Sequence, residues 1–220
     1  MTEPTLDEAI RRRFDQEDVA REYALRKNSP ASARNRRELA CILAGLDGIA
    51  PGARVLDLPT GTGRLIRPLL ERGHEVLAAD YSLYMLEQAR AQVPEGQAGR
   101  VTFAQIDVMA IDLADDAVDV TICNRLLHHY PTAELRRRAL TELARVTRER
   151  LVVSYFSNLA VSALRFHLGN WLRRRTPTDR IPVWPATFAA DAEAAGLRID
   201  GRHAVRPGRS PQTYLVLSPR

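Results

Sequence analysis

The chain has 220 residues, a formal net charge of +5 and a sequence pI of about 9.7. This length fits one α/β domain with a substantial core and is too short for two domains of ordinary size. The sequence contains no apolar run of about 18 residues and begins with a charged segment, so we expect a cytoplasmic protein without a membrane-spanning helix or a signal peptide.

Positive charge is concentrated in the last third of the chain. Residues 1–156 include 22 basic and 23 acidic side chains, whereas residues 157–220 include 10 basic and 4 acidic side chains. This asymmetry indicates an acidic partner or an anionic substrate near the C-terminal segments, and a solvated surface is the alternative.

Two helical patterns precede the first predicted strand. Apolar residues recur with helical spacing from Leu6 to Lys27 and again from Arg34 to Leu46, and a loop at residues 28–30 separates the two patterns. We therefore expect surface helices at the start of the chain.

The most informative segment is VLDLPTGTGRL, residues 55–65. Arg54–Leu58 has the apolar run of a buried strand, a glycine turn follows, and Arg64–Arg72 continues with helical periodicity. In open α/β sheets such a turn binds a nucleotide-like ligand outside the carboxyl end of the strand. The dinucleotide fingerprint is incomplete, because Ile66 stands where its third glycine belongs, and no phosphate-loop motif occurs.

The same segment resembles motif I of the class I S-adenosylmethionine-dependent methyltransferases, in which an acidic residue and a short spacer precede G-x-G. The residues that carry the resemblance, and that it assigns to the cofactor site, are Asp57, Pro59, Gly61 and Gly63. The resemblance therefore implies that the cofactor is S-adenosyl-L-methionine.

The next strand strengthens this resemblance. Glu75–Asp80 has the pattern of a buried strand that ends in an acid, and a carboxylate at this point can accept hydrogen bonds from both ribose hydroxyls of an adenosine. The run DYSLYMLEQAR resembles motif II of the family, with Ser82 as a helix N-cap. The resemblance places Asp80, Tyr81 and Met85 in the cofactor site, with Met85 against the adenine.

A third and a fourth strand, at residues 101–107 and 117–124, also end in polar residues. The string DVTICNRLLHHYP around the end of the fourth strand resembles motif IV of the family and its sequel. The residues that the resemblance assigns to the cofactor at these two strand ends are Asp107, Val108, Asn124 and Arg125. Asp107 and Val108 match the family's adenine-binding position.

The remaining elements complete one α/β sheet. Periodicity predicts helices at 132–147, 158–175 and 186–195, and strands at 150–156, 197–205 and 212–217, of which the last two can pair as a hairpin. The predicted fold is a single Rossmann-like class I methyltransferase domain. Its seven-stranded sheet is mainly parallel, with an antiparallel C-terminal hairpin strand and helices on both faces.

Within this fold we expect residues 1–50 to be helices that cover the cofactor site and residues 51–220 to form the methyltransferase domain. The resemblance makes Tyr23, Arg34 and Arg37 candidates to hold the methionine carboxylate, with exposed helix charges as the alternative. Residues 157–182 form a lid or an insertion that shapes the acceptor pocket.

The predicted activity is methyl transfer to an O, N or C atom of a small-molecule or lipid-linked acceptor. His128 and His129 follow the fourth strand, and an imidazole has a suitable intrinsic pKa for a general base, although a structural role is the alternative. The arginine run at residues 173–175 favours an anionic acceptor or contact with a membrane surface, and simple solvation of these charges is the other interpretation.

Other classes of function receive less support from the sequence. The residues after Asn124 do not match the N/D-P-P-Y tetrapeptide of the enzymes that methylate adenine or glutamine amino groups. Neither cysteine follows a proline, as the nucleophile of the cytosine-C5 enzymes does. We also expect no metal site and no dedicated nucleic-acid module. An NAD(P)-dependent oxidoreductase and a non-catalytic S-adenosylmethionine-binding module remain alternatives. The acceptor and the oligomeric state are left open.

Overall fold

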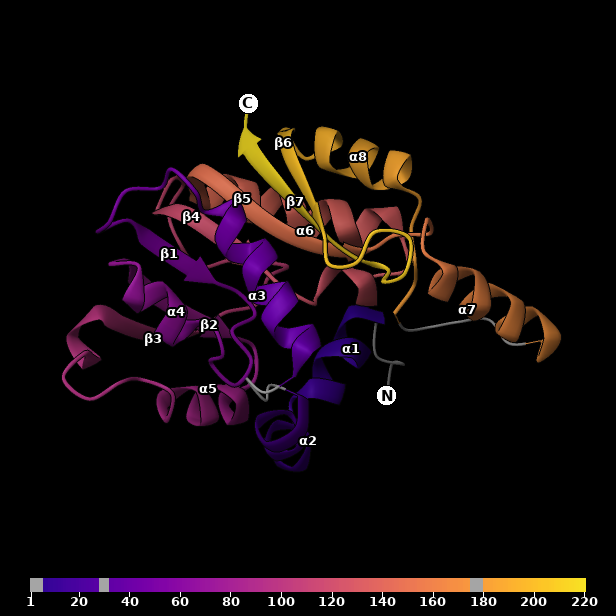
Figure 1. The fold of residues 1–220 in the computed structure, drawn as a ribbon. Coiled ribbons are helices and arrows are strands. Elements are labelled where there is room, and N and C mark those ends of the chain that lie inside the picture. Colours follow the sequence, from indigo (N-terminus) through magenta and orange to yellow (C-terminus); the bar gives the residue numbers. More distant parts are fainter. Residues whose placement is uncertain (1–5, 28–31, 175–179) are drawn as a thin grey trace.

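A computed structural model of the protein describes residues 6–27, 32–174 and 180–220. Its centre is a seven-stranded sheet in the order β3-β2-β1-β4-β5-β7-β6 (Figure 1). The strands are β1 (Arg54–Asp57), β2 (Glu75–Asp80), β3 (Val101–Gln105), β4 (Val118–Cys123), β5 (Thr147–Phe156), β6 (Leu197–Ala204) and β7 (Gln212–Pro219). β1 to β5 are parallel to one another, and β7 is antiparallel to both β5 and β6, which confirms the predicted fold class.

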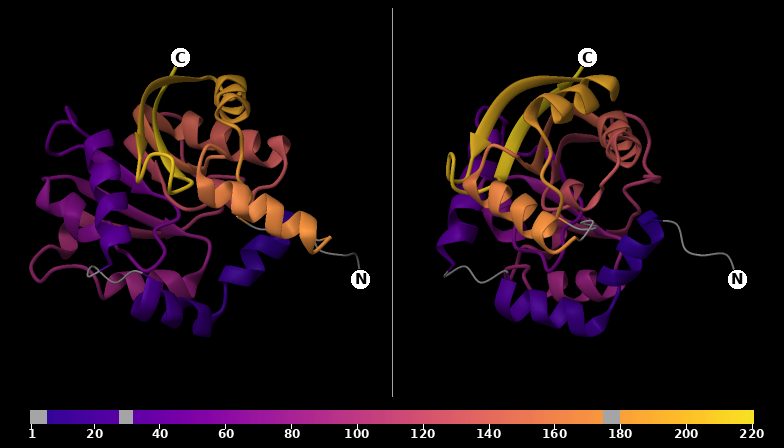
Figure 2. Two further views of the ribbon diagram at one scale, coloured as in Figure 1. Left: turned by 45° about the vertical axis from the view of Figure 1, so that its right-hand side comes forward. Right: turned by 90° about the vertical axis from the view of Figure 1, so that its right-hand side faces the viewer.

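Helices cover both faces of the sheet (Figure 2). On one face α6 (Ala133–Val146) and α8 (Pro185–Ala194) share a buried cluster with strand residues such as Leu56 and Val153. On the other face, α3 (Ala33–Gly45), α4 (Ile66–Glu71) and α5 (Leu83–Arg90) share a cluster with Val55 and Val152. Neighbouring residues of one strand therefore enter opposite cores, as the two-residue repeat of a strand requires.

The contact between α3 and the sheet is close because Gly45 has no side chain. A Cβ atom on Gly45 would lie 2.9 Å from Cγ2 of Val152 in β5. This packing holds α3 directly against β5 and β7, and residues of its first half reach the carboxyl ends of the parallel strands.

The N-terminal segment forms α1 (Leu6–Phe14), α2 (Glu17–Glu22) and a π-helical turn (Tyr23–Lys27). α1 and α2 lie near the carboxyl ends of β1 and β2 (Figure 1). The strand order explains why a ligand site forms here: β1 pairs with β2 on one side and with β4 on the other, so the connections leave in opposite directions and open a crevice.

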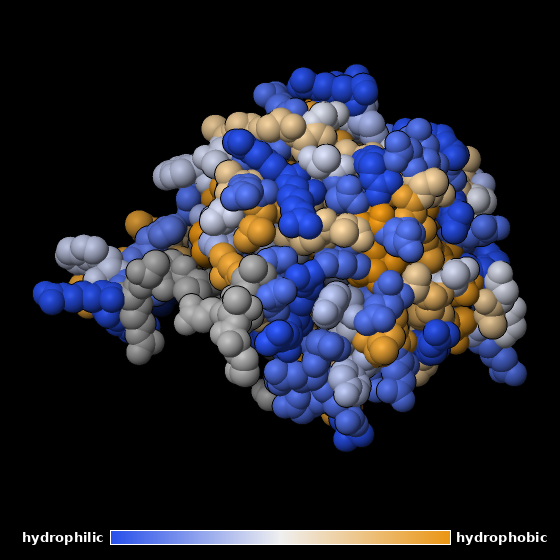
Figure 3. All heavy atoms as spheres, turned by 180° about the vertical axis from the view of Figure 1, so that it is seen from behind, coloured by the Kyte–Doolittle hydropathy of each residue, from blue (hydrophilic) through white to orange (hydrophobic). Residues whose placement is uncertain are grey.

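α7 (Val161–Leu172) projects away from the sheet (Figures 1 and 3). Ala163 is the only residue of this helix that is buried. The large apolar side chains Val161, Leu164, Leu168, Trp171 and Leu172 are all exposed, and Trp171 is 74% exposed. In the described part of the chain, no helix combines the length and the apolar character needed to cross a bilayer.

Element boundaries differ from the predictions by a few residues. β3 ends at Gln105, so Asp107 lies in the following turn, and β5 begins at Thr147, three residues before the predicted strand. The reason for the second difference is that α6 passes directly into β5: the Thr147 hydroxyl donates to the Leu143 carbonyl at 2.6 Å and ends the helix without a loop. Short 3₁₀ helices occur at Ala98–Arg100 and Leu127–His129.

Candidate active site

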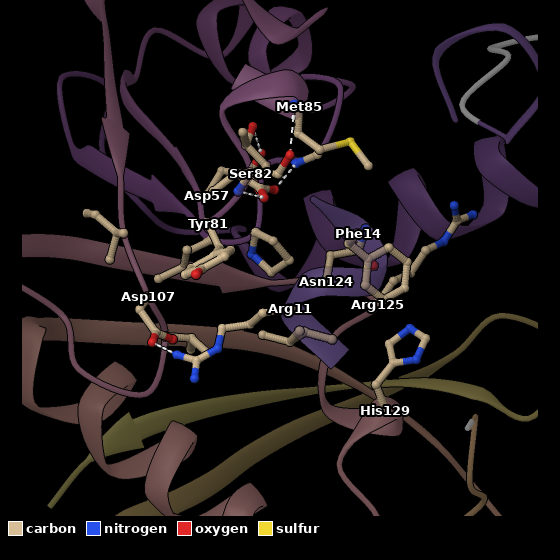
Figure 4. Close-up of a pocket in the computed structure, with 18 of the residues that line it drawn as sticks. Arg11, Phe14, Asp57, Tyr81, Ser82, Met85, Asp107, Asn124, Arg125 and His129 are labelled. Carbon is tan, nitrogen blue, oxygen red and sulfur yellow. Dashed lines mark hydrogen bonds and ion pairs between the residues drawn. The ribbon is translucent and has the colours of Figure 1, made fainter. Parts of the chain in front are cut away.

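A pocket at the carboxyl ends of the parallel strands brings most of the predicted site residues together (Figure 4). We call it the ligand pocket. The predicted residues that line it are Asp57, Pro59, Gly61, Asp80, Tyr81, Met85, Asp107, Val108, Asn124, Arg125 and His129. Gly63 and His128 do not line it.

The two glycines of the turn after β1 have different environments. Both have a positive φ, +55° at Gly61 and +78° at Gly63. A Cβ on Gly61 would meet no atom within 4 Å, whereas a Cβ on Gly63 would lie 2.9 Å from Cα of Ala89 in α5. Gly61 therefore leaves open space at the pocket wall, and Gly63 allows the turn to pack against α5.

Two buried carboxylates, Asp57 and Asp80, face the ligand pocket from adjacent strands. Oδ2 of Asp57 accepts a hydrogen bond from the Thr60 hydroxyl at 2.8 Å, while its Oδ1 has no hydrogen-bond partner among the described residues. Burial raises the pKa of Asp57 to about 7 and the pKa of Asp80 to about 6. Hydrogen bonds that the Asp80 carboxylate accepts from the Ser82 and Gly61 amides, at 3.0 and 2.8 Å, oppose that rise in pKa.

The third acid of the pocket, Asp107, is engaged by α1. Arg11 donates from Nη1 to Oδ2 of Asp107, and the Met109 amide donates to Oδ1 at 3.0 Å. The same Arg11 donates to Asp7 at 2.9 Å and lies over the Tyr81 ring, 5.3 Å from its centroid. Arg11 thus joins α1 to the edge of the pocket (Figure 4).

A buried carboxylate on α3, Glu38, organises the opposite end of the pocket. It is fully buried and accepts hydrogen bonds from Arg34 at 2.9 Å, Arg64 at 3.1 Å and Arg125 at 2.9 Å. The side-chain oxygen of Asn35 accepts a further bond from Arg125 at 2.7 Å. Three guanidinium groups around one carboxylate leave an excess of positive charge, and two of them, Arg64 and Arg125, line the ligand pocket.

Arg125 reaches Glu38 from an unusual backbone conformation. Its φ is +60°, which is uncommon for a residue with a Cβ, and its amide donates to the Ser154 hydroxyl at 2.7 Å. Burial, followed by the neighbouring Arg64, lowers the pKa of Arg125 from its ordinary value. A residue with a strained backbone, two positions after the end of a central strand, is typical of a functional site.

Asn124, at the end of β4, is held by a residue from the C-terminal strand. The Tyr214 hydroxyl in β7 donates to the Asn124 side-chain oxygen at 2.8 Å. Burial raises the pKa of Tyr214, so the phenol stays protonated and can act as this donor. The amide group of Asn124 is therefore oriented at the pocket wall.

The two adjacent histidines face different surroundings. Both belong to the 3₁₀ helix after β4 and both are 4% exposed. The His128 ring stacks on Phe156 with centroids 4.0 Å apart, whereas the His129 ring meets the edge of Phe14 from α1 at 5.1 Å. Only His129 lines the ligand pocket.

A second hollow, which we call the basic chamber, adjoins the ligand pocket. Tyr23, Arg125 and His129 line both cavities. The other lining residues of the basic chamber are Ser32, Arg34, Asn35, Arg37, His128, Phe156, Ser162, Arg180, Val205, Arg206, Arg209, Ser210 and Pro211.

The arginines that the sequence analysis singled out lie in different parts of the structure. Arg34 and Arg37 line the basic chamber and not the ligand pocket. Arg173 and Arg174 are exposed beyond the end of α7 and line neither cavity, and Arg175 lies outside the described residues. Within those described residues, no group of three or more His, Cys, Asp or Glu side chains is arranged to hold a metal ion.

Sequence reasoning missed Arg11, Phe14, Glu38 and Arg64. The sequence does contain a signal for Glu38. It lies four residues before Ile42, which is fully buried on the same face of α3. A carboxylate on the buried face of a helix is expected to be paired with a positive charge. The other three residues have no local signature. Their positions depend on how distant helices fold over the sheet.

Comparisons with known proteins agree with the motifs and with the sheet order. Residues 55–150 match a family described as a methyltransferase domain. The chain is 30% identical over 241 aligned residues to the demethylmenaquinone methyltransferase of Parafrankia sp. (strain EAN1pec), an alignment that covers 89% of this chain and 92% of the relative. It is 29% identical over 182 residues to the protein of the same name from Renibacterium salmoninarum, covering 81% and 73%.

Among solved structures, the magnesium protoporphyrin IX methyltransferase of Synechocystis PCC 6803 with bound SAH has a similar fold. The TM-score is 0.75 at 20% sequence identity, and the superposition covers 98% of this chain and 100% of that one.

Proposed function

This chain belongs to the class I S-adenosylmethionine-dependent methyltransferases, and we propose that it transfers the methyl group of this cofactor to a small-molecule acceptor bound in the basic chamber. The single observation that carries the assignment of the acceptor site is the wall between the two cavities. Tyr23, Arg125 and His129 line both, so a cofactor in the ligand pocket and an acceptor in the basic chamber would meet there.

The residues of the ligand pocket suit an adenosyl sulfonium cofactor. Each carboxylate oxygen has more than one acceptor position, so Asp80 can receive ribose hydroxyls in addition to the two amides that it already binds. Oδ1 of Asp57 is buried without a partner among the residues described, and Gly61 leaves open space beside it. The excess of positive charge at Arg64 and Arg125 supports a place for the methionine carboxylate.

The bound cofactor supplies an electrophilic methyl group to a nucleophile of the acceptor. The residues of the chain align the acceptor and exclude water from the junction. Phe14 and Tyr23 contribute to this exclusion, because Phe14 packs against both the Tyr23 ring at 6.1 Å and the His129 ring at 5.1 Å. This arrangement supports the interpretation of residues 1–50 as a cover over the site.

We assign the role of general base to His129 rather than to His128. Proton removal from a hydroxyl or a protonated nitrogen requires a base within reach of the reacting atom. His129 lines both cavities, whereas His128 lines only the basic chamber and stacks on Phe156. His128 therefore serves as part of the acceptor wall.

The acceptor is lipid-linked in this proposal. The two relatives described above are named for demethylmenaquinone, and α7 exposes an apolar stripe to solvent next to the basic chamber. α7 begins at the basic chamber, where Ser162 forms part of the wall. Ser162 and Arg180 are the described residues of the segment 157–182 that line the chamber. An apolar helix surface at the entrance supports contact with a membrane surface that holds the acceptor.

Calorimetric titration followed by an acceptor screen tests the function. We expect the protein to bind S-adenosylmethionine and its demethylated product, to show no binding of nicotinamide dinucleotides, and to form a methylated product with at least one small or lipid-linked acceptor by mass spectrometry. Binding of a nicotinamide dinucleotide instead of the sulfonium would favour an oxidoreductase. Cofactor binding without turnover across hydroxyl, amine and carbon acceptors would favour a binding module.

A further inference from the structure

The wall of the basic chamber is unusual in its charge. Six arginines line it, from α3, from residue 125 after β4, from residue 180 and from the connection between β6 and β7, and the lining includes no aspartate or glutamate among the described residues. Arg34 and Arg125 share the carboxylate of Glu38, which is buried outside the chamber. Like charges gathered around a hollow repel one another, and an anion in the hollow would relieve that repulsion.

Three of these arginines have no counter-charge. Within residues 6–27, 32–174 and 180–220, the guanidinium groups of Arg37, Arg206 and Arg209 form no ion pair, and all three side chains are exposed at the chamber. Guanidinium groups bind carboxylates and phosphates through paired, charge-assisted hydrogen bonds. The three groups are therefore available for one oxyanion of a ligand.

The turn that carries Arg206 and Arg209 is held in place by backbone hydrogen bonds. The amides of Arg209 and Ser210 both donate to the Arg206 carbonyl, at 3.0 and 2.9 Å. The start of α7 fastens the same turn, because the Val161 amide donates to the Gly208 carbonyl at 3.0 Å and the Ser162 hydroxyl donates to the Arg209 carbonyl at 3.1 Å. A turn ordered before binding loses less entropy when it receives a ligand.

The chamber also has an apolar side. Phe156, Val205 and Pro211 line it together with the arginines. The reacting atom of the acceptor belongs at the shared wall with the ligand pocket, whereas Arg37, Arg206 and Arg209 line the basic chamber and do not line the ligand pocket. The geometry suits an acceptor with an apolar body between its reacting atom and a charged group.

We infer that the acceptor carries an oxyanion, either a carboxylate or a phosphate, and that Arg37, Arg206 and Arg209 bind it in the basic chamber. This inference rests on the proposed function, because it names the class of acceptor for the same site. It gives the three arginines the role of specificity determinants, and it differs from an anionic site at Arg173 and Arg174, which line neither cavity.

The test compares two double variants with the same change in charge. Arg206→Gln/Arg209→Gln removes two charges from the chamber, and Arg173→Gln/Arg174→Gln removes two charges from exposed positions outside both cavities. Calorimetry at low salt measures binding of inorganic pyrophosphate and of 2-naphthoate to each protein saturated with the demethylated cofactor. The neutral 2-naphthamide serves as the uncharged counterpart of the naphthoate.

We expect the wild-type protein to bind at least one anion saturably. The chamber variant should bind it at least about ten-fold more weakly, which corresponds to about 1.4 kcal/mol, because charge-assisted hydrogen bonds are lost. The control variant should bind the anion as tightly as the wild type does, and Arg37→Gln should weaken the binding of the same anion. Preference for pyrophosphate identifies a phosphate-bearing acceptor, and preference for naphthoate identifies a carboxylic acid.

Three results would overturn the inference: no saturable anion binding by the wild type, an equal loss in both double variants, or naphthamide binding as tight as that of naphthoate. Failure of the proposed function is distinguishable, because it would appear as loss of binding of the demethylated cofactor to the wild-type protein before any anion is added. An unchanged affinity for that cofactor in all variants also verifies that they fold.

Discussion

Arg11 of α1 and Asp107 after β3 form an ion pair at the edge of the ligand pocket, although 96 residues separate them in the sequence. Their side chains are only 20% and 24% exposed, and Arg11 also lies over Tyr81. The pair joins α1 to the residue that the family resemblance places at the adenine. We therefore propose that exchange of the cofactor involves this contact.

Replacement of Arg11 should accelerate cofactor exchange. In Arg11→Ala the cover loses its ion pair with Asp107 and its contact with Tyr81, so we expect dissociation of the demethylated cofactor to become about three- to ten-fold faster, as for loss of about 1 kcal/mol. Stopped-flow displacement measures the rate. Arg12→Ala is the control, since Arg12 is exposed and outside the pocket. Equal dissociation rates in the two variants would contradict a role of Arg11 in retaining the cofactor.

Cofactor affinity should fall in acid. The pKa of Asp80 is raised by burial to about 6, so the carboxylate is ionised at pH 8 and mostly protonated at pH 5. Ribose hydroxyls bind the ionised form more strongly, and we expect affinity to decrease about ten-fold between pH 8 and pH 5. Calorimetry in buffers of different ionisation enthalpy should detect proton release on binding near pH 6. Asp80→Asn should bind weakly and should lose most of this release.

The two glycines of the turn should differ in what they control. Gly61→Ala adds a methyl group in open space at the pocket, so it should retain most of its stability, with strain of about 1–2 kcal/mol, and lose at least about ten-fold in cofactor affinity. Gly63→Ala drives the same group against the backbone of Ala89 and should lower the free energy of unfolding by about 3 kcal/mol. Denaturant unfolding and calorimetry separate the effects, and equal unfolding midpoints would argue against them.

The adjacent histidines provide a matched test of the base. His129→Gln should reduce kcat by about 10²-fold or more and remove the acidic limb of the kcat–pH profile, as expected for loss of a general base. His128→Gln should keep the shape of that profile, because its ring belongs to the acceptor wall. Steady-state kinetics with the acceptor found in the screen measures both. A profile that keeps its acidic limb in His129→Gln would rule out the assigned role.

Glu38 should stabilise the fold through its three arginines. Glu38→Gln leaves Arg64 and Arg125 without their counter-charge in a buried setting, and we expect a loss of about 3–5 kcal/mol in the free energy of unfolding. Glu71→Gln, at an exposed position at the end of α4, should change it by less than about 0.5 kcal/mol. Chemical denaturation gives both values. A small effect at Glu38 would mean that water compensates the arginines.

The sheet and the acids of the ligand pocket follow from the sequence for a physical reason. Parallel strands end at the same edge of the sheet, so polar residues at successive strand ends must meet, and Asp57, Asp80 and Asp107 are such residues. The apolar strand runs and the Ser82 cap, which accepts from the Met85 amide, are likewise local features.

The covering helix and the basic chamber do not follow from local pattern. Arg37, Arg206 and Arg209 look like ordinary surface charges, and only the packing of α3 against the β6–β7 hairpin brings them around one hollow. His128 and His129 are adjacent in the sequence, and the 3₁₀ helix decides which ring faces which cavity. Packing between segments that are far apart in the sequence determines these features. The two-residue and 3.6-residue periodicities of strands and helices carry no information about that packing.

Tyr23, Arg125 and His129 line both cavities, so under the proposed function they would link the affinities of the cofactor and the acceptor. A cofactor that shifts any of these side chains changes the surface offered to the acceptor, and thermodynamic reciprocity then requires the acceptor to change cofactor affinity by the same factor. The methylated product and the spent cofactor would be coupled in the same way, so each would change the affinity of the protein for the other through side chains that line both cavities.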